Sequence, residues 1–182
     1  MNITNIRDTS GRLFEFNHSE LTVDDLYLSK IECSIFLFSD SAANISDLSL
    51  TNLNVSSVVV NSNSDLAISN SNFHSIEVQV LVSVDNFSNL TIEESMFSMI
   101  YADSLLNFTD STFSLTLSYF NKLNLKHFIS LTYSSASLSN SSIIEVESSQ
   151  SLINADDSMI AINLIEVEDI VLETFLIQMI QL

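Results

Sequence analysis

The sequence contains no proline and no tryptophan, a single glycine, a single cysteine and five basic residues. Helix ends and tight β-hairpins usually rely on glycine or proline, so their scarcity disfavours hairpin-rich β folds. Turns must instead use Asn, Asp and Ser, whose short side chains bond the adjacent backbone and tolerate left-handed geometry. Because Cys33 is the lone cysteine, an intrachain disulfide and a cysteine-based zinc cluster are excluded.

Positive charge is also scarce, since 23 acidic residues give a net charge of −18. This charge argues against binding to nucleic-acid phosphates or to anionic membrane surfaces. The hydrophobic share of 46% is sufficient for a core, so the Ser and Asn content does not indicate disorder. No secretory signal is recognisable at the N-terminus. Four carboxylates in the apolar stretch from Met159 to Leu182 argue against membrane insertion.

An internal repeat runs through the whole chain. Short apolar bursts that end in a Ser/Asn/Asp cluster recur every 22 to 25 residues. They begin at Leu13, Ile35, Val58, Val80, Leu105, Phe128, Leu152 and Phe175. A period this steady predicts a repeat architecture.

A second repeated unit has apolar residues at its positions 1, 3, 6, 8 and 11, as in LTVDDLYLSKI from Leu21. Steps of two residues are typical of strands, and each step of three reverses the alternation at a corner. A helix would require steps of three and four. Further copies begin at Ala43, Leu66, Leu90, Leu115, Ala136 and Ile160. Each period therefore predicts about three short strands separated by corners.

These patterns predict an all-β fold, a single-stranded parallel β-helix of about eight coils of about 23 residues. We expect one domain over residues 1–182, with 1–12 as an irregular or partial first coil. Leucine-rich repeats require a different signature, helical repeats are longer, and a β-sandwich would not produce so constant a period. Within the second unit, one buried column is predicted from Leu21, Leu66, Leu90, Leu115 and Ile160.

Two polar exceptions inside the second unit lead to specific expectations. Ser71 and Ser95 fall in adjacent coils and are predicted to bond in a ladder. Lys122 occupies an apolar position, but burying an unpaired ammonium costs several kcal/mol. We therefore expect a local slip that places Leu123 inward instead.

The coil pattern, with LAISNSNF over 66–73 and VVVNSNS from Val58, resembles the right-handed parallel β-helix of the pectin-lyase-like superfamily. It is similar to β-helix regions of large surface proteins of protists, ciliates especially. That superfamily includes polysaccharide lyases and hydrolases. Their catalytic sets have no counterpart here, because Asp24–Asp25 and Asp156–Asp157 lie in different coils without an Arg-x-Lys. We therefore expect no enzymatic activity and no cofactor.

Two groups of residues are candidates for a metal or catalytic site. A shared corner position holds an oxygen-bearing side chain in five coils, which could form a calcium stripe but is also what a solvated corner looks like. The solvated corner is the favoured interpretation. The three histidines, His18, His74 and His127, fall at different positions and cannot form one ligand column. The shared corner position holds Asp25, Asp47, Asn70, Glu94 and Asn140, with Tyr119 and Leu164 in the other coils.

Asn-x-Ser/Thr sequons are candidate sites for N-linked glycans, and several fall in corners or at outward positions. Asn17, Asn44 and Asn140 in particular are predicted to be exposed. Attached glycans would favour an extracellular or cell-surface location. The candidates are Asn2, Asn17, Asn44, Asn54, Asn86, Asn89, Asn107 and Asn140.

Three functions remain open on the sequence. The first is a non-catalytic structural protein, a rigid acidic segment of a surface scaffold, stalk or filament. Its partners would be copies of itself stacked end to end, or flanking coils of the same polypeptide, because the last coil is apolar and lacks a polar cap. The second is a carbohydrate-binding or polysaccharide-processing protein, which would align outward aromatics on one face; Tyr27, Tyr101 and Tyr119 are expected at different positions. The third is an intracellular scaffold.

Overall fold

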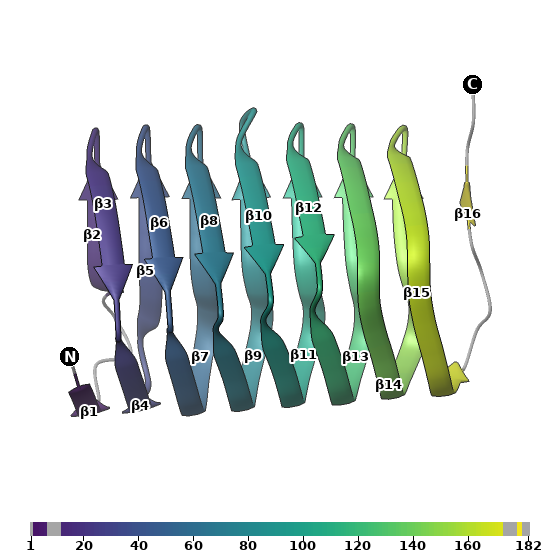
Figure 1. Cartoon of the computed structure of the whole chain (residues 1–182), viewed down its shortest axis with the longest axis horizontal. Coiled ribbons are helices and arrows are strands. Elements are labelled where there is room, and N and C mark those ends of the chain that lie inside the picture. The colour runs from purple at the N-terminus through teal and green to yellow at the C-terminus, as the bar shows by residue number, and fades with distance from the viewer. Residues whose placement is uncertain (1, 7–11, 173–177, 180–182) are drawn as a thin grey trace.

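Figure 1 shows the computed structural model of the chain, in which strands wind in successive coils along one long axis. The structure describes residues 2–6, 12–172 and 178–179. In these ranges all sixteen strands belong to one sheet, neighbouring strands are parallel, and no helix is present. The described chain is therefore a parallel β-solenoid of about seven turns, which confirms the predicted fold class.

The strands have the following bounds. They are β1 (Asn2–Ile6), β2 (Arg12–Asn17), β3 (Glu20–Asp24), β4 (Tyr27–Ile31), β5 (Ser34–Ser39), β6 (Ala42–Ser46), β7 (Ser49–Ser62), β8 (Asp65–Ser69), β9 (Asn72–Asp85), β10 (Asn89–Glu93), β11 (Met96–Thr109), β12 (Thr112–Thr116), β13 (Tyr119–Thr132), β14 (Ser135–Asp156), β15 (Met159–Leu172) and β16 (Gln178–Met179).

The strands stack in three columns, which we call faces A, B and C. Face A contains β2, β5 and the later parts of β7, β9, β11, β13 and β14. Face B contains β3, β6, β8, β10, β12 and the first parts of β14 and β15. Face C contains β1, β4 and the remaining parts of the long strands. Each coil thus passes through faces B, C and A in turn.

Each coil has three left-handed turns, which we call its first, second and third corners, and each contains a residue with φ between 45° and 61°. None of these residues is glycine. Asn and Asp, which tolerate left-handed geometry best, are the most frequent. The first corner, between faces A and B, contains His18, Asp40, Asn63, Asn86, Asp110, Tyr133 and Asp157, and Phe87 in addition. The second corner, between faces B and C, contains Asp25, Asp47, Asn70, Glu94, Leu117, Asn140 and Leu164. The third corner, within face C, contains Lys30, Asn52, Ser75, Met99, Lys122, Glu145 and Asp169.

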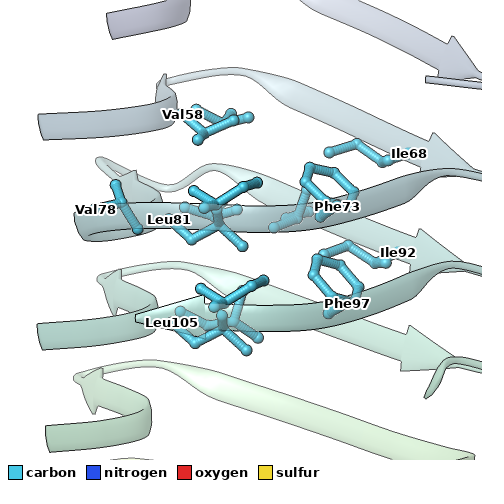
Figure 2. Close-up of a cluster of buried hydrophobic side chains, with 14 of the residues drawn as sticks. Val58, Ile68, Phe73, Val78, Leu81, Ile92, Phe97 and Leu105 are labelled. Carbon is cyan, nitrogen blue, oxygen red and sulfur yellow. The ribbon is translucent and has the colours of Figure 1, made fainter. Parts of the chain in front are cut away.

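Inward side chains of consecutive coils stack on one another to form a single core along the axis. In Figure 2, Phe73 and Phe97 lie one above the other, as do Leu81 and Leu105. The rings of Phe73 and Phe97 are 4.6 Å apart and nearly parallel, and Phe97 stacks in the same way on Phe120 at 4.7 Å. All five side chains are fully buried. Because each residue packs against its counterpart in the next coil, the repeat in sequence becomes a repeat in packing.

The predicted apolar column on face B is correct except for Leu115. Phe113 takes that place, since its Cα partners are Leu90 and Ala136. Leu115 is also fully buried, but it lies two residues further along the strand. Phe113 and Leu115 of β12 both point inward, because side chains alternate along a strand. The apolar pattern alone therefore could not tell which of them begins the repeated unit. Leu21, Leu66, Leu90 and Ile160 do share the column, but only Leu66 and Leu90 are buried as predicted, since Leu21 and Ile160 are partly buried.

The same two-residue shift changes the second corner of this coil. Leu117 occupies the left-handed position, whereas Tyr119 had been expected there. The inward placement of Leu123 is confirmed: it is buried beside Ile100, while Lys122 lies at the third corner with its side chain 58% exposed. The predicted local slip is wrong, because this coil pairs with the preceding coil without a register shift. In face A, Leu81 and not Val80 aligns with the first residue of the other bursts.

The described residues form about seven turns where eight were expected. The eighth burst, at Phe175, lies outside the described residues. The pair Gln178–Met179 nevertheless continues face A, opposite Asn154 and Ala155 of β14.

Two serine ladders stabilise the corners between coils. At the second corner the backbone N–H of Ser71 donates to Oγ of Ser95, 3.2 Å away, and the Ser95 hydroxyl donates to the Glu93 carbonyl. The predicted link between Ser71 and Ser95 is therefore confirmed, although it joins a backbone group to a hydroxyl. Ser118 and Ser141 continue this ladder.

The second ladder runs along the first corner. Ser64, which follows the left-handed Asn63, accepts from the backbone N–H of Ser41 one coil earlier and donates to the Ser62 carbonyl of its own coil. Ser41 and Ser134 repeat this arrangement. Both ladders satisfy buried N–H groups that the turn removes from the strand pairing. One run of these bonds joins Ser19, Ser41, Ser64 and Ser88, and a second run joins Ser111, Ser134 and Ser158.

Replacing Leu123 by Ala should lower the free energy of unfolding by about 2–4 kcal/mol, because it leaves a cavity in a fully packed column. Lys122→Ala should change it by less than about 1 kcal/mol, since that side chain is largely exposed. Urea unfolding followed by circular dichroism measures both changes. The reverse order of effects would place Lys122 inward and contradict the observed register.

Ser95→Ala should lower the free energy of unfolding by about 1–3 kcal/mol, because it leaves the buried Ser71 N–H without its acceptor. The matched control is Ser137→Ala, at an exposed serine on face B, which should change stability by less than about 0.5 kcal/mol. Equal effects in urea titrations would show that the ladder contributes nothing to stability.

Candidate functional site

The candidate glycosylation sites lie mostly on the outside of the coils. Asn17, Asn44 and Asn140 are exposed, as predicted. Asn54, Asn86 and Asn89 are also exposed, and Asn107 is half-buried. Asn2 belongs to β1, but its side chain lies outside the described part of the structure. Whether any of these residues carries a sugar stays a prediction.

Hydrogen bonding distinguishes among these asparagines. Nδ2 of Asn89 donates to Asp65 at 2.6 Å, and its Oδ1 accepts from the Thr112 hydroxyl. Nδ2 of Asn86 donates to Ser62 and to Asp85. A glycan on Asn86 or Asn89 would disrupt such bonds, because the sugar replaces a hydrogen on the same nitrogen.

The oxygen-bearing residues of the second corner do lie in one row along the axis, except that Leu117 replaces Tyr119. Asp47 lies beside Asp24 and Asp25, and partial desolvation and the Asp24 carboxylate raise the pKa of Asp47 above its ordinary value. Among residues 12–172 and the other described segments, no group of three or more His, Cys, Asp or Glu side chains is arranged to hold a metal ion. This corner therefore brings carboxylates close together without, among the described residues, a His/Cys/Asp/Glu cluster that could hold a metal ion.

The three histidines lie in different places, as the sequence predicts. His18 is an exposed first-corner residue 3.8 Å from Asp40. Nδ1 of His74 is 2.9 Å from the Ser98 hydroxyl, and Nδ1 of His127 is 2.9 Å from the Ser151 hydroxyl. In a catalytic triad a carboxylate orients the histidine from its other nitrogen. Among the described residues, the one histidine within ion-pair distance of a carboxylate is His18, beside Asp40. The contacts of His74 with Ser98 and of His127 with Ser151 therefore link neighbouring coils but do not form a triad.

A groove follows the first corner along the side of the solenoid. It consists of two hollows of about 680 and 370 Å³ that meet at Phe87 and Asn89. We call the combined feature the first-corner groove. Its carboxylate-bearing residues are Glu20, Asp40, Asp65, Asp110 and Asp157, and its exposed apolar side chains are Phe87, Tyr133 and Met159.

The aromatic side chains are arranged differently from the expectation. Tyr27 and Tyr119 occupy the same position of face C, four coils apart, so the expectation that they differ is wrong; it followed from the two-residue shift in this coil. Tyr101 lies elsewhere, opposite Glu77. Sequence reasoning missed Phe87 and Tyr133, which share the first corner and are 83% and 60% exposed.

A sequence signal for Phe87 was present. In VDNFS the burst is followed by an extra residue between the left-handed Asn86 and the ladder serine Ser88, whereas the other coils have the serine directly after the corner residue. The insertion places a large apolar side chain outside the stack.

In the coil that contains β15, apolar side chains are exposed at positions where the corresponding side chains of the preceding coil are buried. Ile162 and Val167 of β15 are 57% and 50% exposed, whereas their partners in β14, Leu138 and Ile143, are 2% and 3% exposed. Among the described residues, β14 is the only strand that pairs with β15.

No protein family, no characterised protein and no solved structure matches this chain. The described residues include no helix that could span a membrane.

Proposed function

We propose that the protein is a non-catalytic structural element, a rigid acidic β-solenoid segment of an extracellular or cell-surface scaffold, stalk or filament. The observation that carries this proposal is the exposed apolar edge formed by β15. A further coil stacked on this edge would bury Ile162 and Val167 as β15 itself buries Leu138 and Ile143. It would also pair the side of β15 on which no described strand lies.

The coil that covers β15 would come from the N-terminal end of a second copy or from flanking coils of the same polypeptide. The opposite end of the described solenoid supports this, because it also presents apolar side chains that are only partly buried. Phe14 and Phe16 stack on Phe36 and Phe38, and Leu21 and Val23 pack against the same core. Apolar surfaces at both ends would allow head-to-tail stacking, which propagates as a filament.

The surface location rests on the exposed sequons and on the resemblance to right-handed, pectin-lyase-like coils of protist surface proteins. The excess of carboxylates would keep such a rod soluble and discourage association along its sides. We assign the protein no partner among nucleic acids or lipids.

The chain should associate reversibly at micromolar concentrations. The double variant Ile162→Lys/Val167→Lys should shift sedimentation-velocity profiles towards the monomer. It places two ammonium groups in the part of the stacking interface at β15 that would be buried. Ala161→Lys adds a charge to the same strand at an exposed, outward position and should leave the association nearly unchanged.

Both sets of variants should retain the circular dichroism spectrum of the parent, because the altered side chains are exposed. A parent chain that stays monomeric throughout this concentration range would contradict stacking through β15. So would an equal effect of the two sets of variants.

Chain secreted from eukaryotic cells should carry N-glycans, with Asn44 and Asn140 among the occupied sites, because both side chains point outward without a side-chain hydrogen bond to another described residue. Asn89 should be unoccupied or poorly occupied, since its amide bonds Asp65 and Thr112. Intact mass followed by glycopeptide mapping gives the occupancy. A bare polypeptide mass from natural material would count against a surface location.

A further inference from the structure

The first-corner groove contains an aromatic side chain that the solenoid does not need for its own packing. Phe87 is 83% exposed, the highest value among the large apolar residues that the structure describes. It is the second of two consecutive residues with positive φ, where the same corner of the other coils has one. Its backbone N–H donates to the Asp110 carbonyl at 2.8 Å, so the inserted residue remains tied to the next coil. The insertion thus presents a ring to solvent from a fixed backbone.

A buried polar residue lies behind this insertion. Asn61 is 0% exposed, at a position that Phe38 and Val84 fill in the adjacent coils. Its Nδ2 donates to the Ser64 carbonyl at 3.0 Å and to the Asn89 carbonyl at 3.4 Å, while its Oδ1 has no partner. Burying an amide costs free energy unless its polar atoms are hydrogen-bonded, and here only the Nδ2 side of Asn61 is. Ser64 and Asn89 both line the groove, so Asn61 supports the wall from which Phe87 projects.

A second ring lies further along the same corner. Tyr133 is 60% exposed and is two coils beyond Phe87, a separation of about 10 Å at the usual strand spacing. Asp110 occupies the corner of the coil between them. An extended ligand lying along the axis could therefore contact both rings and the intervening carboxylate.

The charges of the groove indicate what kind of ligand would bind. Five carboxylates line it, and of the described residues neither hollow includes a Lys or an Arg. Guanidinium and ammonium groups bind both to carboxylates and to the faces of aromatic rings. A second copy of this chain, at a net charge of −18, would be repelled from this acidic side of the solenoid.

We propose that the first-corner groove binds an extended, arginine- or lysine-rich segment of a partner protein, with Phe87 and Tyr133 stacking on its cationic side chains and Asp110 and Asp157 pairing with them. This activity is independent of the stacking of coils at β15. Along a stalk or filament, it would provide lateral attachment for a basic partner.

Fluorescence anisotropy of a short labelled peptide of alternating Arg and Ala residues, titrated with the full chain at physiological salt, tests this proposal. Phe87→Ala and Tyr133→Ala should each raise the Kd about fivefold, because each removes an exposed cation–π contact. Tyr101→Ala is the matched control, since Tyr101 is also 60% exposed but lies away from the groove. It should change the Kd by less than about twofold.

A second pair of variants separates the groove from the overall charge. Asp110→Asn/Asp157→Asn and Asp25→Asn/Asp47→Asn remove the same number of charges, and Asn tolerates the left-handed corner at all four positions. Only the first double variant should raise the Kd, about fivefold.

Three results would overturn the proposal. Equal weakening by the groove and control variants would show non-specific attraction to an acidic surface. The absence of saturable peptide binding would exclude a cationic ligand. Binding of a neutral cello-oligosaccharide in place of the peptide, with the same dependence on Phe87 and Tyr133, would make the groove a sugar site.

Discussion

The structure depends on the stacking of each coil directly on the one before it. Parallel pairing places a residue opposite its counterpart one repeat away, as Leu66 lies opposite Leu90 and Phe73 opposite Phe97. Every coil is therefore the template for the next, and a change in coil length is absorbed at a corner or at a bulge, such as the one in β14 opposite Leu125–His127. Phe87 shows this tolerance: despite the inserted residue, Leu90 remains paired with Leu66. The same insertion inside a strand, without a bulge to absorb it, would turn every following side chain to the opposite face.

Closing each coil without glycine carries an energetic cost. A non-glycine residue in the left-handed region costs about 1–3 kcal/mol, less for Asn and Asp than for residues such as Leu117 or Tyr133. The stacked neighbours and the serine ladders offset this cost, because they satisfy backbone groups that the turn takes out of the pairing. Corners are consequently rigid, and their side chains point outward at fixed intervals.

This arrangement gives the solenoid two kinds of surface with different chemistry. The end at β15 is apolar, with Ile162 and Val167 exposed, and suits a further coil of the same kind. The sides are acidic, and the first-corner groove adds Phe87 and Tyr133 to a row of carboxylates. Because the two surfaces are separate, lengthening the rod at its end would leave the groove accessible along its side. Lateral repulsion between acidic rods would favour growth along the axis.

The sequence by itself determined the class of fold, the coil length and most of the inward positions, because alternating apolar residues at a constant period have one efficient way to be buried. It also indicated that Leu123 and not Lys122 points inward, since an unpaired buried charge is too costly. Where two placements satisfied the same alternation, as for Phe113 and Leu115, the sequence was ambiguous, and pairing with the adjacent coils decided between them. Only the tertiary structure brought Phe87, Asp110 and Tyr133 into one groove and placed Asn61 behind it. These residues are more than twenty positions apart in sequence, and a corner residue's neighbours are set by the stacking of coils, which no local pattern encodes.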